Sequence, residues 1–321
     1  MILPCLGVKT GELYVRVITD FETAKSIITS KSFDNYSMAD RYRELEARTG
    51  LHFPHAIALL ERLPVFLNGD IHIRIRKAMA RQISQTKECQ FAQAQTLFKE
   101  LLQAHFKAGS RFDLVADVAR PLWRSVSTAI VPRNEFSVEL VDEIPGLFSP
   151  ILSIRERLRI DRLIGEYAEV FPGEDSLILL CLAALGARPF IGSWSLSIYQ
   201  LLEENPGRAL SAIAWPEAYP DSSLTYVDRV CNDAAQERDF SFGERVRCMT
   251  HYSGYSMEQR KLSLFGFGAH TCLGKSISEK VWTMTTRELS GIDLVPNCLG
   301  KNMSRHSDPF QMPSSMRIEF R

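Results

Sequence analysis

Cys272 lies in a glycine-rich stretch whose residue types could hold a metal-bound cofactor. The stretch leads directly into a predicted helix and reads Phe265-Gly266-Phe267-Gly268-Ala269-His270-Thr271-Cys272-Leu273-Gly274. Glycines so close together indicate a backbone that turns tightly or lies against a flat surface, where a Cβ atom would collide. A thiol near the start of a helix lies at the positive end of the helix dipole, which favours the thiolate. A thiolate donates electron density to haem iron. The alternative is that Cys272 is a small buried hydrophobic residue, as most free cysteines are.

The same stretch matches, position for position, the haem-binding signature of the cytochrome P450 family, in which Phe, Gly, Gly, His, Cys and Gly are fixed. The chain resembles this family over most of its length. The resemblance implies haem b as the cofactor, Cys272 as the proximal iron ligand and His270 as a partner of a haem propionate. It implies further cofactor-binding positions at Phe265 near the sulfur, at Gly268 against the porphyrin, and at Gly266 and Gly274.

A second match lies upstream, where residues 70–77 resemble the basic helix of the family, with the pattern His-any-Arg-any-Arg. His72 and Arg76 are four residues apart and share one face of a helix, so both side chains could reach one carboxylate. The alternative is a solvated basic helix face. Arg229, in a predicted strand, also resembles a propionate ligand of the family.

The helix expected on the oxygen side of the haem is unusual, because Arg188 and Pro189 follow its glycine. Typical monooxygenases carry an acid and a threonine there. The Arg-Pro pair resembles a peroxygenase branch of the family, in which the arginine binds a substrate carboxylate that acts as acid and base on hydrogen peroxide. We therefore name Arg188, Pro189 and Ser193 as catalytic candidates, with Ser193 able to replace the missing hydroxyl. Alternatively, Arg188 faces solvent or a structural acid, and Pro189 only bends the helix.

The sequence departs from the family pattern at a conserved pair of residues, and it is also short at its start and in its lid region, which predicts a shortened fold. The Glu-any-any-Arg pair expected just before Tyr219 is absent, since Ala214 and Glu217 stand there, and Arg260 is the residue that could keep part of its network. The sequence opens directly on its first predicted strand, and residues 132–173 are few for the two helices that form the lid in the family.

The elements that must position these residues are mostly helical. The patterns predict a strand at 13–19, a β-rich region at 224–250 with strands at 225–231, 238–242 and 244–250, and short strands in the tail. They predict helices at residues 20–30 (capped by Asp20), 72–83, 88–108, 112–130, 152–170, 176–204 and 273–289. We therefore expect a mainly α fold with a minor β region, cytochrome P450-like, in a single domain of residues 1–321.

Composition narrows the classes of partner. Lys and Arg together equal Asp and Glu at 38 each, so no net charge favours nucleic acid or an anionic membrane. The longest apolar run is too short to cross a bilayer, and seven scattered cysteines without a CxxC pair favour reduced thiols. We expect a cytoplasmic protein that binds a small-molecule substrate, with a ferredoxin or flavoprotein reductase as electron donor unless peroxide is the oxidant.

The function predicted by the resemblance is a haem-thiolate oxidoreductase, either a monooxygenase or a peroxygenase. Its substrate would be a small organic molecule, bearing a carboxylate if Arg188 points toward it, and its setting a specialised biosynthetic pathway. One alternative is a haem-thiolate dehydratase or isomerase that needs no external oxidant. Another is a non-catalytic haem-binding protein.

Overall fold

A computed structural model describes residues 15–85, 88–131, 138–149, 151–233, 239–304 and 309–321. The chain divides into two compact units built from interleaved segments. The first unit consists of Met1–Ala78, Leu152–Cys181 and Leu224–Cys272, and the second consists of Met79–Ile151, Leu182–Ser223 and Leu273–Arg321. The expectation of a single domain stays a prediction.

The first unit contains a four-stranded sheet in the order β1 (Arg16–Ile18), β5 (Arg245–Met249), β4 (Tyr226–Cys231) and β2 (Phe33–Asn35). β1 runs parallel to β5, while β4 is antiparallel to both β5 and β2. Alternation along β5 buries Val246 and Cys248 on one face of the sheet.

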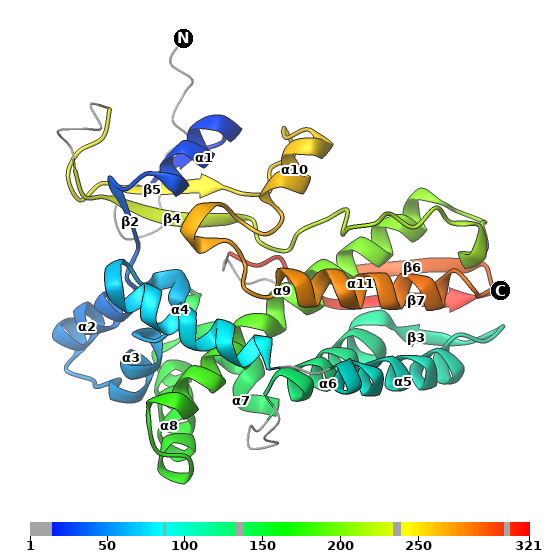
Figure 1. The fold of residues 1–321 in the computed structure, drawn as a ribbon, viewed down its shortest axis with the longest axis horizontal. Helices are drawn as coiled ribbons and strands as arrows, with labels where there is room; N and C mark the ends of the chain where they lie inside the picture. Colours follow the sequence, from blue (N-terminus) through cyan, green and yellow to red (C-terminus); the bar gives the residue numbers. More distant parts are fainter. Residues whose placement is uncertain (1–14, 86–87, 132–137, 150, 234–238, 305–308) are drawn as a thin grey trace. The chain divides into compact units, whose positions relative to one another are not determined.

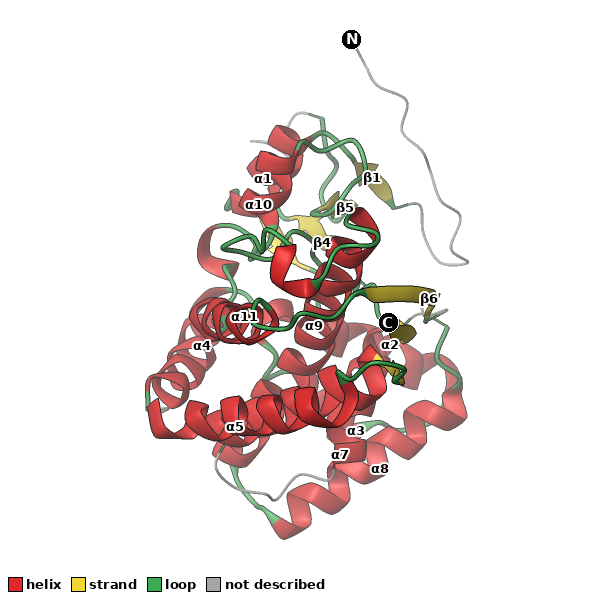
Figure 2. Cartoon of the chain, turned by 90° about the vertical axis from the view of Figure 1, so that its right-hand side faces the viewer, coloured by secondary structure: helices red, strands yellow, loops and turns green. Residues whose placement is uncertain are grey.

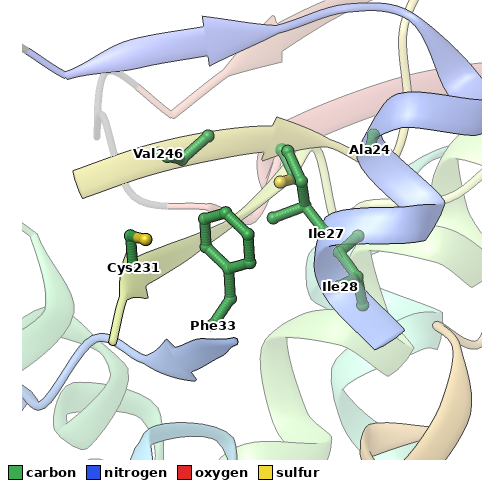
Figure 3. Close-up of a cluster of buried hydrophobic side chains, with 7 residues drawn as sticks. Ala24, Ile27, Ile28, Phe33, Cys231 and Val246 are labelled. Carbon is green, nitrogen blue, oxygen red and sulfur yellow. The ribbon is translucent and has the colours of Figure 1, made fainter. Parts of the chain in front are cut away.

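Helix α1 (Phe21–Thr29) covers that buried face. Asp20 caps the helix by accepting the backbone N–H of Thr23 at 2.9 Å, as its sequence position predicts. In Figure 3 the α1 side chains of Ala24, Ile27 and Ile28 lie against Phe33 of β2 and Cys231 of β4. The core of this region therefore joins α1 and β2, which are neighbours in the sequence, to β4 and β5, which are far away in it.

The other helices of the first unit are α2 (Met38–Thr49), α3 (Pro54–Leu60), α8 (Ile154–Val170) and α10 (Met257–Ser263). Ser153 and Ser256 begin α8 and α10 with reciprocal capping boxes. α3 packs against both α2 and α8. Figures 1 and 2 both show α1 and α10 beside the β4–β5 pair.

Within its described residues the second unit combines a three-stranded antiparallel sheet with four helices that lie wholly inside it, and it also holds parts of two longer helices. The sheet has the order β3 (Arg111–Asp113), β7 (Pro313–Phe320) and β6 (Pro296–Met303). The helices are α5 (Glu88–His105), α6 (Arg120–Ile130), α7 (Val138–Glu143) and α11 (Lys275–Leu289), with α5 packed along α6 (Figure 1).

Two helices continue from one unit into the other, namely α4 (Gly69–Ser84) and α9 (Glu174–Glu204). Among the described residues α9 is the one helix long and apolar enough to cross a membrane, with a mean hydropathy of 1.7 in its best window. Half of that window is buried inside the protein, and the core helix of a soluble protein passes the same test.

Most predicted elements are present, and two predictions are wrong. The helix predicted at 112–130 starts late, because residues Arg111–Asp113 form strand β3 on β7 and Leu114–Ala119 form a π-helical segment before α6. The strand predicted at 238–242 is absent from its described part, residues 239–242. Gly243, at φ 78°, makes a tight turn there and donates its N–H to the Cys231 carbonyl at 2.8 Å.

Other predictions were incomplete. α2, α3 and α10 were not predicted, since their polar or short sequences carry a weak helical period. Residues 13 and 14 of the first predicted strand and residues 132–137 of the predicted lid lie outside the described residues. What is described between 138 and 170 is α7, a five-residue 3₁₀ turn (Ile144–Phe148) and α8.

Candidate cofactor site

The cysteine stretch forms a compact loop in the first unit. Cys272 donates its backbone N–H to the Phe265 carbonyl at 2.7 Å, which closes the loop. Gly266 and Gly268 have φ values of 73° and 61°, a left-handed conformation that side chains with a Cβ rarely adopt. A Cβ on Gly268 would also lie 3.2 Å from the Thr29 side chain of α1. Glycine is therefore needed at both positions because of the left-handed φ values. At Gly268 the contact with Thr29 is a second reason.

The Cys272 side chain is exposed and lies three residues before α11 begins at Lys275. Gly274, in the second unit, is the N-cap residue of α11. Phe265 is half-buried, and its neighbour Phe267 packs edge-on against Phe21 with ring centroids 5.9 Å apart. An accessible sulfur on a backbone held this firmly is suited to ligating a metal.

The basic helix α4 brings His72 against the cysteine loop. His72 is buried, and its ring centroid lies 4.1 Å from that of His270. Arg76, one turn further along, donates a hydrogen bond from its guanidinium to the Thr271 carbonyl. The i, i+4 spacing thus places both predicted side chains of α4 on the loop that carries Cys272, and the alternative of a fully solvated helix face is wrong.

Arg229 reaches the same cluster from the sheet. It lies on β4, is buried to 4% exposure, and bonds through its guanidinium to the Asp228 carbonyl at 3.1 Å. Burial lowers the pKa of Arg229, and it also lowers the pKa of Arg76, against which the charge of Cys272 acts in the opposite direction. His72, Arg76, Arg229 and His270 therefore gather as one group of basic side chains, with the thiol nearby.

The imidazole of His270 has a strongly lowered pKa. Burial lowers the pKa of His270 to about 3, and the charges of His72, Arg229 and Arg76 act in the same direction. Burial and Arg76 also lower the pKa of His72. Both imidazoles are therefore neutral at pH 7. An anion placed among these groups would pair with the charges of Arg76 and Arg229.

Asn35 is a member of this cluster that the sequence patterns did not identify. It is buried at the end of β2, and its side-chain Nδ2 lies 3.0 Å from Nε2 and 3.4 Å from Nδ1 of His270. The same Nδ2 donates to the Leu67 carbonyl at 2.7 Å. The signal that could have found it is a polar amide at the end of a short strand, since asparagine is disfavoured in strands. We call Asn35, His72, Arg76, Arg229 and His270 the His270 cluster.

Two polar atoms of the His270 cluster are buried without a hydrogen-bond partner in the described part of the chain: Nε2 of His72 and Oδ1 of Asn35. Native proteins leave few such atoms unsatisfied, because each one costs about 1–3 kcal/mol. The cluster thus has hydrogen-bonding capacity left over for a ligand.

The predicted catalytic candidates lie in the second unit, within α9. Pro189 sits inside the helix and Arg188 is half-buried. The Ser193 hydroxyl accepts the backbone N–H of Ser223 at 2.9 Å and lies 3.2 Å from the Ser223 hydroxyl, which in turn donates to the Pro189 carbonyl at 3.2 Å. Gly186 has a packing role, because a Cβ there would lie 2.2 Å from the Trp123 ring. The hydroxyl of Ser193 is therefore engaged by the chain itself.

The segment that lacks the Glu-any-any-Arg pair is held by aromatic residues instead. Ala214 and Glu217 lie in an irregular stretch after a short 3₁₀ turn, Leu210–Ala212. Within the second unit, Trp282 of α11 donates to the Pro216 carbonyl at 2.8 Å, and the Tyr219 hydroxyl donates to the Ser278 carbonyl at 3.1 Å. Arg260 lies in the first unit and donates to the Ser253 carbonyl at 3.0 Å.

No protein-family model matches the chain, and no curated protein matches it by sequence. Solved structures do match. The structure of P450BioI in complex with an acyl carrier protein ligated to hexadec-9Z-enoic acid has a TM-score of 0.73 at 15% identity, over 99% of this chain and 95% of that chain. CalO2 gives 0.71 at 15% identity, over 96% and 91%. Econazole-bound CYP164A2 of Mycobacterium smegmatis gives 0.70 at 18% identity, over 95% and 91%.

These scores extend over nearly the whole chain, although identity is low. They agree with the mainly helical architecture and the two small sheets. The chain has the cytochrome P450 fold.

Proposed function

We propose that this protein is a haem-thiolate oxidoreductase that binds haem b with Cys272 as the axial ligand. The observation that carries the proposal is the His270 cluster. Three basic side chains, those of His72, Arg76 and Arg229, lie around the half-buried imidazole of His270, and the Nε2 atom of His72 has no partner among the described residues. The two carboxylates of haem b supply the charge and the acceptors that such a cluster lacks.

The donor set fits the cofactor in chemistry as well as in charge. Cys272 is exposed and lies at the end of a loop in which Gly266 and Gly268 adopt left-handed φ values. Its thiolate would be the single protein ligand of the iron, and His72, Arg76, Arg229 and His270 would bind the propionates. The carbonyl of Phe265, which accepts the Cys272 N–H at 2.7 Å, would fix where the sulfur lies. When bound, the haem would supply the activation of dioxygen or hydrogen peroxide.

The substrate would be a small organic molecule. Arg188 would bind a carboxylate on it, because a guanidinium holds a carboxylate through two parallel hydrogen bonds. That carboxylate would then hold the proton that typical monooxygenases deliver from an acid and a threonine. A role for the Ser193 hydroxyl as proton donor would require it to leave its contacts with Ser223. Where peroxide is not the oxidant, a ferredoxin or flavoprotein reductase would supply electrons.

Reconstitution with haem followed by turnover tests the proposal. The haem-loaded protein is mixed with carboxylic acids of increasing chain length and hydrogen peroxide, and separately with dioxygen and a reductase system. We expect oxidised product under one of these conditions. We also expect Arg188→Ala to abolish turnover with peroxide while the absorbance spectrum is unchanged. Peroxide turnover that is unchanged in Arg188→Ala would remove the role of Arg188.

A second function is favoured by the contacts of α9. Pro189 carries no hydroxyl, and the Ser193 hydroxyl contacts Ser223, so neither residue can donate a hydroxyl proton to an oxidant without the loss of a contact within the chain. A haem-thiolate dehydratase or isomerase needs no such donor. Product formed anaerobically, without reductant or peroxide, would favour this second function over the first. A haem-bound protein without any turnover would indicate a non-catalytic haem-binding role.

The setting of the protein is also part of the proposal. We place it in the cytoplasm, in a specialised biosynthetic pathway, with no nucleic acid and no membrane as partner. The charge balance of the sequence and the half-buried state of α9 support this. Recovery of the protein in the membrane fraction after cell lysis would contradict it.

A further inference from the structure

Two serines on one face of α9 bind the backbone of residues 221–223 in the second unit. Ser193 and Ser197 lie four residues apart, so they share a face of the helix. The Ser193 hydroxyl accepts the N–H of Ser223 at 2.9 Å, and the Ser197 hydroxyl accepts that of Asp221 at 3.2 Å. Four residues of helix rise about 6 Å and two residues of extended chain span about 7 Å, so the two spacings agree. We call Ser193, Ser197, Asp221 and Ser223 the serine ladder.

Gly192 allows the close approach of the serine ladder. It is buried in α9, and a Cβ there would lie 2.7 Å from the Ser223 Cβ and 2.8 Å from the Gln311 carbonyl oxygen. The Gln311 N–H in turn donates to the Ser223 carbonyl at 2.6 Å. A side chain at position 192 would therefore push Ser223 away from the helix. Ser223 itself is held by two separate segments of the second unit.

The hydroxyl protons at the first pair of the ladder have one consistent arrangement. A carbonyl can only accept, so the Ser223 hydroxyl donates its single proton to the Pro189 carbonyl at 3.2 Å. The Ser193 hydroxyl, whose oxygen lies 3.2 Å from that of Ser223, then donates to Ser223. Both protons are used inside the chain, which favours a positioning role for Ser193 over proton donation.

The serine ladder binds α9 where the helix is interrupted. Pro189 has no N–H, so one backbone hydrogen bond of the helix is missing, and proline is a common site of helix bending. On another face of this turn the Trp123 ring packs closely on Gly186 and lies against Phe190, with ring centroids 5.2 Å apart. Arg188 is half-buried and lies about half a turn around the helix from Gly186. Contacts on two other faces thus hold the turn that carries Arg188.

We propose that Ser193 and Ser223 are positioning residues that fix the direction of the Arg188 guanidinium. Because Pro189 donates no hydrogen bond to the preceding turn, the bond from Ser223 to the Pro189 carbonyl and the pairing of Ser223 with Ser193 restrain the helix there instead. The inference rests on the proposed function for its ligand, a substrate carboxylate on Arg188. The restraint on Arg188 itself can be measured without any ligand.

Modification by phenylglyoxal, which reacts with accessible guanidinium groups, tests this restraint in the purified full chain. Peptide mass spectrometry gives the reaction rate at Arg188 in the wild type, in Ser193→Ala and in Ser223→Ala. We expect each variant to raise this rate about tenfold, the effect of one lost hydrogen bond, and to leave the rate at Arg120 unchanged. An unchanged rate at Arg188 in either folded variant would overturn the proposal.

Ser197→Ala is the matched control. It removes the other hydroxyl of the serine ladder, two turns beyond Pro189, so it should destabilise the protein to urea as much as Ser193→Ala does. The rate at Arg188 should nevertheless stay at the wild-type value. Equal acceleration in Ser197→Ala would show a general loosening of α9 and overturn the proposal. If the alanine variants do not fold, hydrogen exchange in the wild type decides, because a Ser223 N–H that exchanges as fast as in an unfolded peptide is not held by Ser193.

Calorimetric binding of octanoate and of its methyl ester to the haem-loaded protein then links the restraint to a carboxylate. The ester cannot pair with a guanidinium, so we expect Ser193→Ala to weaken octanoate binding about tenfold and to leave binding of the ester unchanged. An equal loss for both compounds would show a purely structural role and overturn the proposal. A wild type that does not prefer octanoate over its ester, with Arg188 still more reactive in Ser193→Ala, would remove the proposed carboxylate role of Arg188 and leave its positioning by the serines intact.

Discussion

Two clusters of buried polar side chains in the first unit differ in how fully their hydrogen-bonding atoms are used. In the cluster between α2, α3 and α8, Arg157 donates to the Tyr42 hydroxyl at 2.6 Å and to the Leu152 carbonyl at 3.1 Å. Asp161 accepts the N–H of Ala56 at 2.7 Å. We call Tyr42, Arg157 and Asp161 the Arg157 cluster. None of its side-chain atoms is among the buried, unpartnered atoms of the described residues.

The His270 cluster, in contrast, leaves some of its buried polar atoms without hydrogen-bond partners among the described residues. It holds mainly basic groups, and it leaves Nε2 of His72 and Oδ1 of Asn35 without partners in the described part of the chain. Because an unsatisfied buried nitrogen and unpaired arginine charges both cost free energy, we expect an anionic acceptor to relieve both in this cluster. The Arg157 cluster should therefore govern stability, and the His270 cluster should govern affinity for the cofactor.

The largest expected effect is on stability, in Arg157→Ala. This change leaves the buried Tyr42 hydroxyl and the Leu152 carbonyl without their charged donor, and we expect it to lower the free energy of unfolding by about 3 kcal/mol. Urea denaturation measures the change. Arg155→Ala, an exposed arginine on the same helix, is the control and should change little. If Arg157→Ala lowered haem affinity and kept its stability, the Arg157 cluster would serve cofactor binding and not stability, which would contradict the comparison.

Arg76→Ala should lower haem affinity and leave the stability of the protein almost unchanged. Removing this guanidinium deletes one charged donor to a carboxylate, so we expect haem affinity to fall about 30-fold, equivalent to about 2 kcal/mol, with little loss of stability. Titration of the haem-free protein followed by absorbance gives the affinity. Lys77→Ala removes an exposed charge from the next position of α4 and serves as control. If Arg76→Ala and Lys77→Ala lose haem affinity equally, the effect comes from the overall positive charge of α4 and not from a specific contact of Arg76.

Asp228 gives a pH-dependent comparison, because its half-buried carboxylate is paired with Arg245 and Arg247. Burial raises the pKa of this carboxyl, but the hydrogen bond from Arg247 at 2.9 Å and the charge of Arg245 outweigh it and hold the pKa below 3.8. A lowered carboxyl pKa adds stability above the unfolded value, and this is lost as pH falls through the folded value. Asp228→Asn should therefore cost about 1.5 kcal/mol at pH 7 and much less near pH 3. Urea midpoints at both pH values test this, and a cost independent of pH would exclude the charge effect.

Gly268→Ala should have the smallest effect. A left-handed φ of 61° costs about 1 kcal/mol for alanine, and the new Cβ would press on Thr29 at 3.2 Å. Gly207→Ala has a similar φ of 75° with no atom within 4 Å, so it separates backbone strain from contact. Thermal unfolding compares the two. A larger loss for Gly207→Ala would show that the contact with Thr29 does not matter.

The sequence predicted the parts of the site that follow local rules. The spacing of His72 and Arg76 predicts one helix face, and the glycines around His270 predict a tight loop before α11; the structure has both. It did not predict Asn35, because its neighbours in the site are set by the pairing of β2 with β4 and are far away in the chain. The late start of the helix predicted at 112–130 has the same cause, since β7 pairs with Arg111–Asp113. The roles of Arg188, Pro189 and Ser193 stay predictions.

The measurement that tests the central claim most directly is the absorbance spectrum of the haem-loaded ferrous protein with carbon monoxide. Ligation by the Cys272 thiolate predicts the red-shifted band of haem-thiolate proteins in the wild type and its loss in Cys272→Ser, with Cys298→Ser as a control that keeps it. A protein that takes up no haem, or a carbon monoxide band at the position typical of a histidine ligand, would contradict the account.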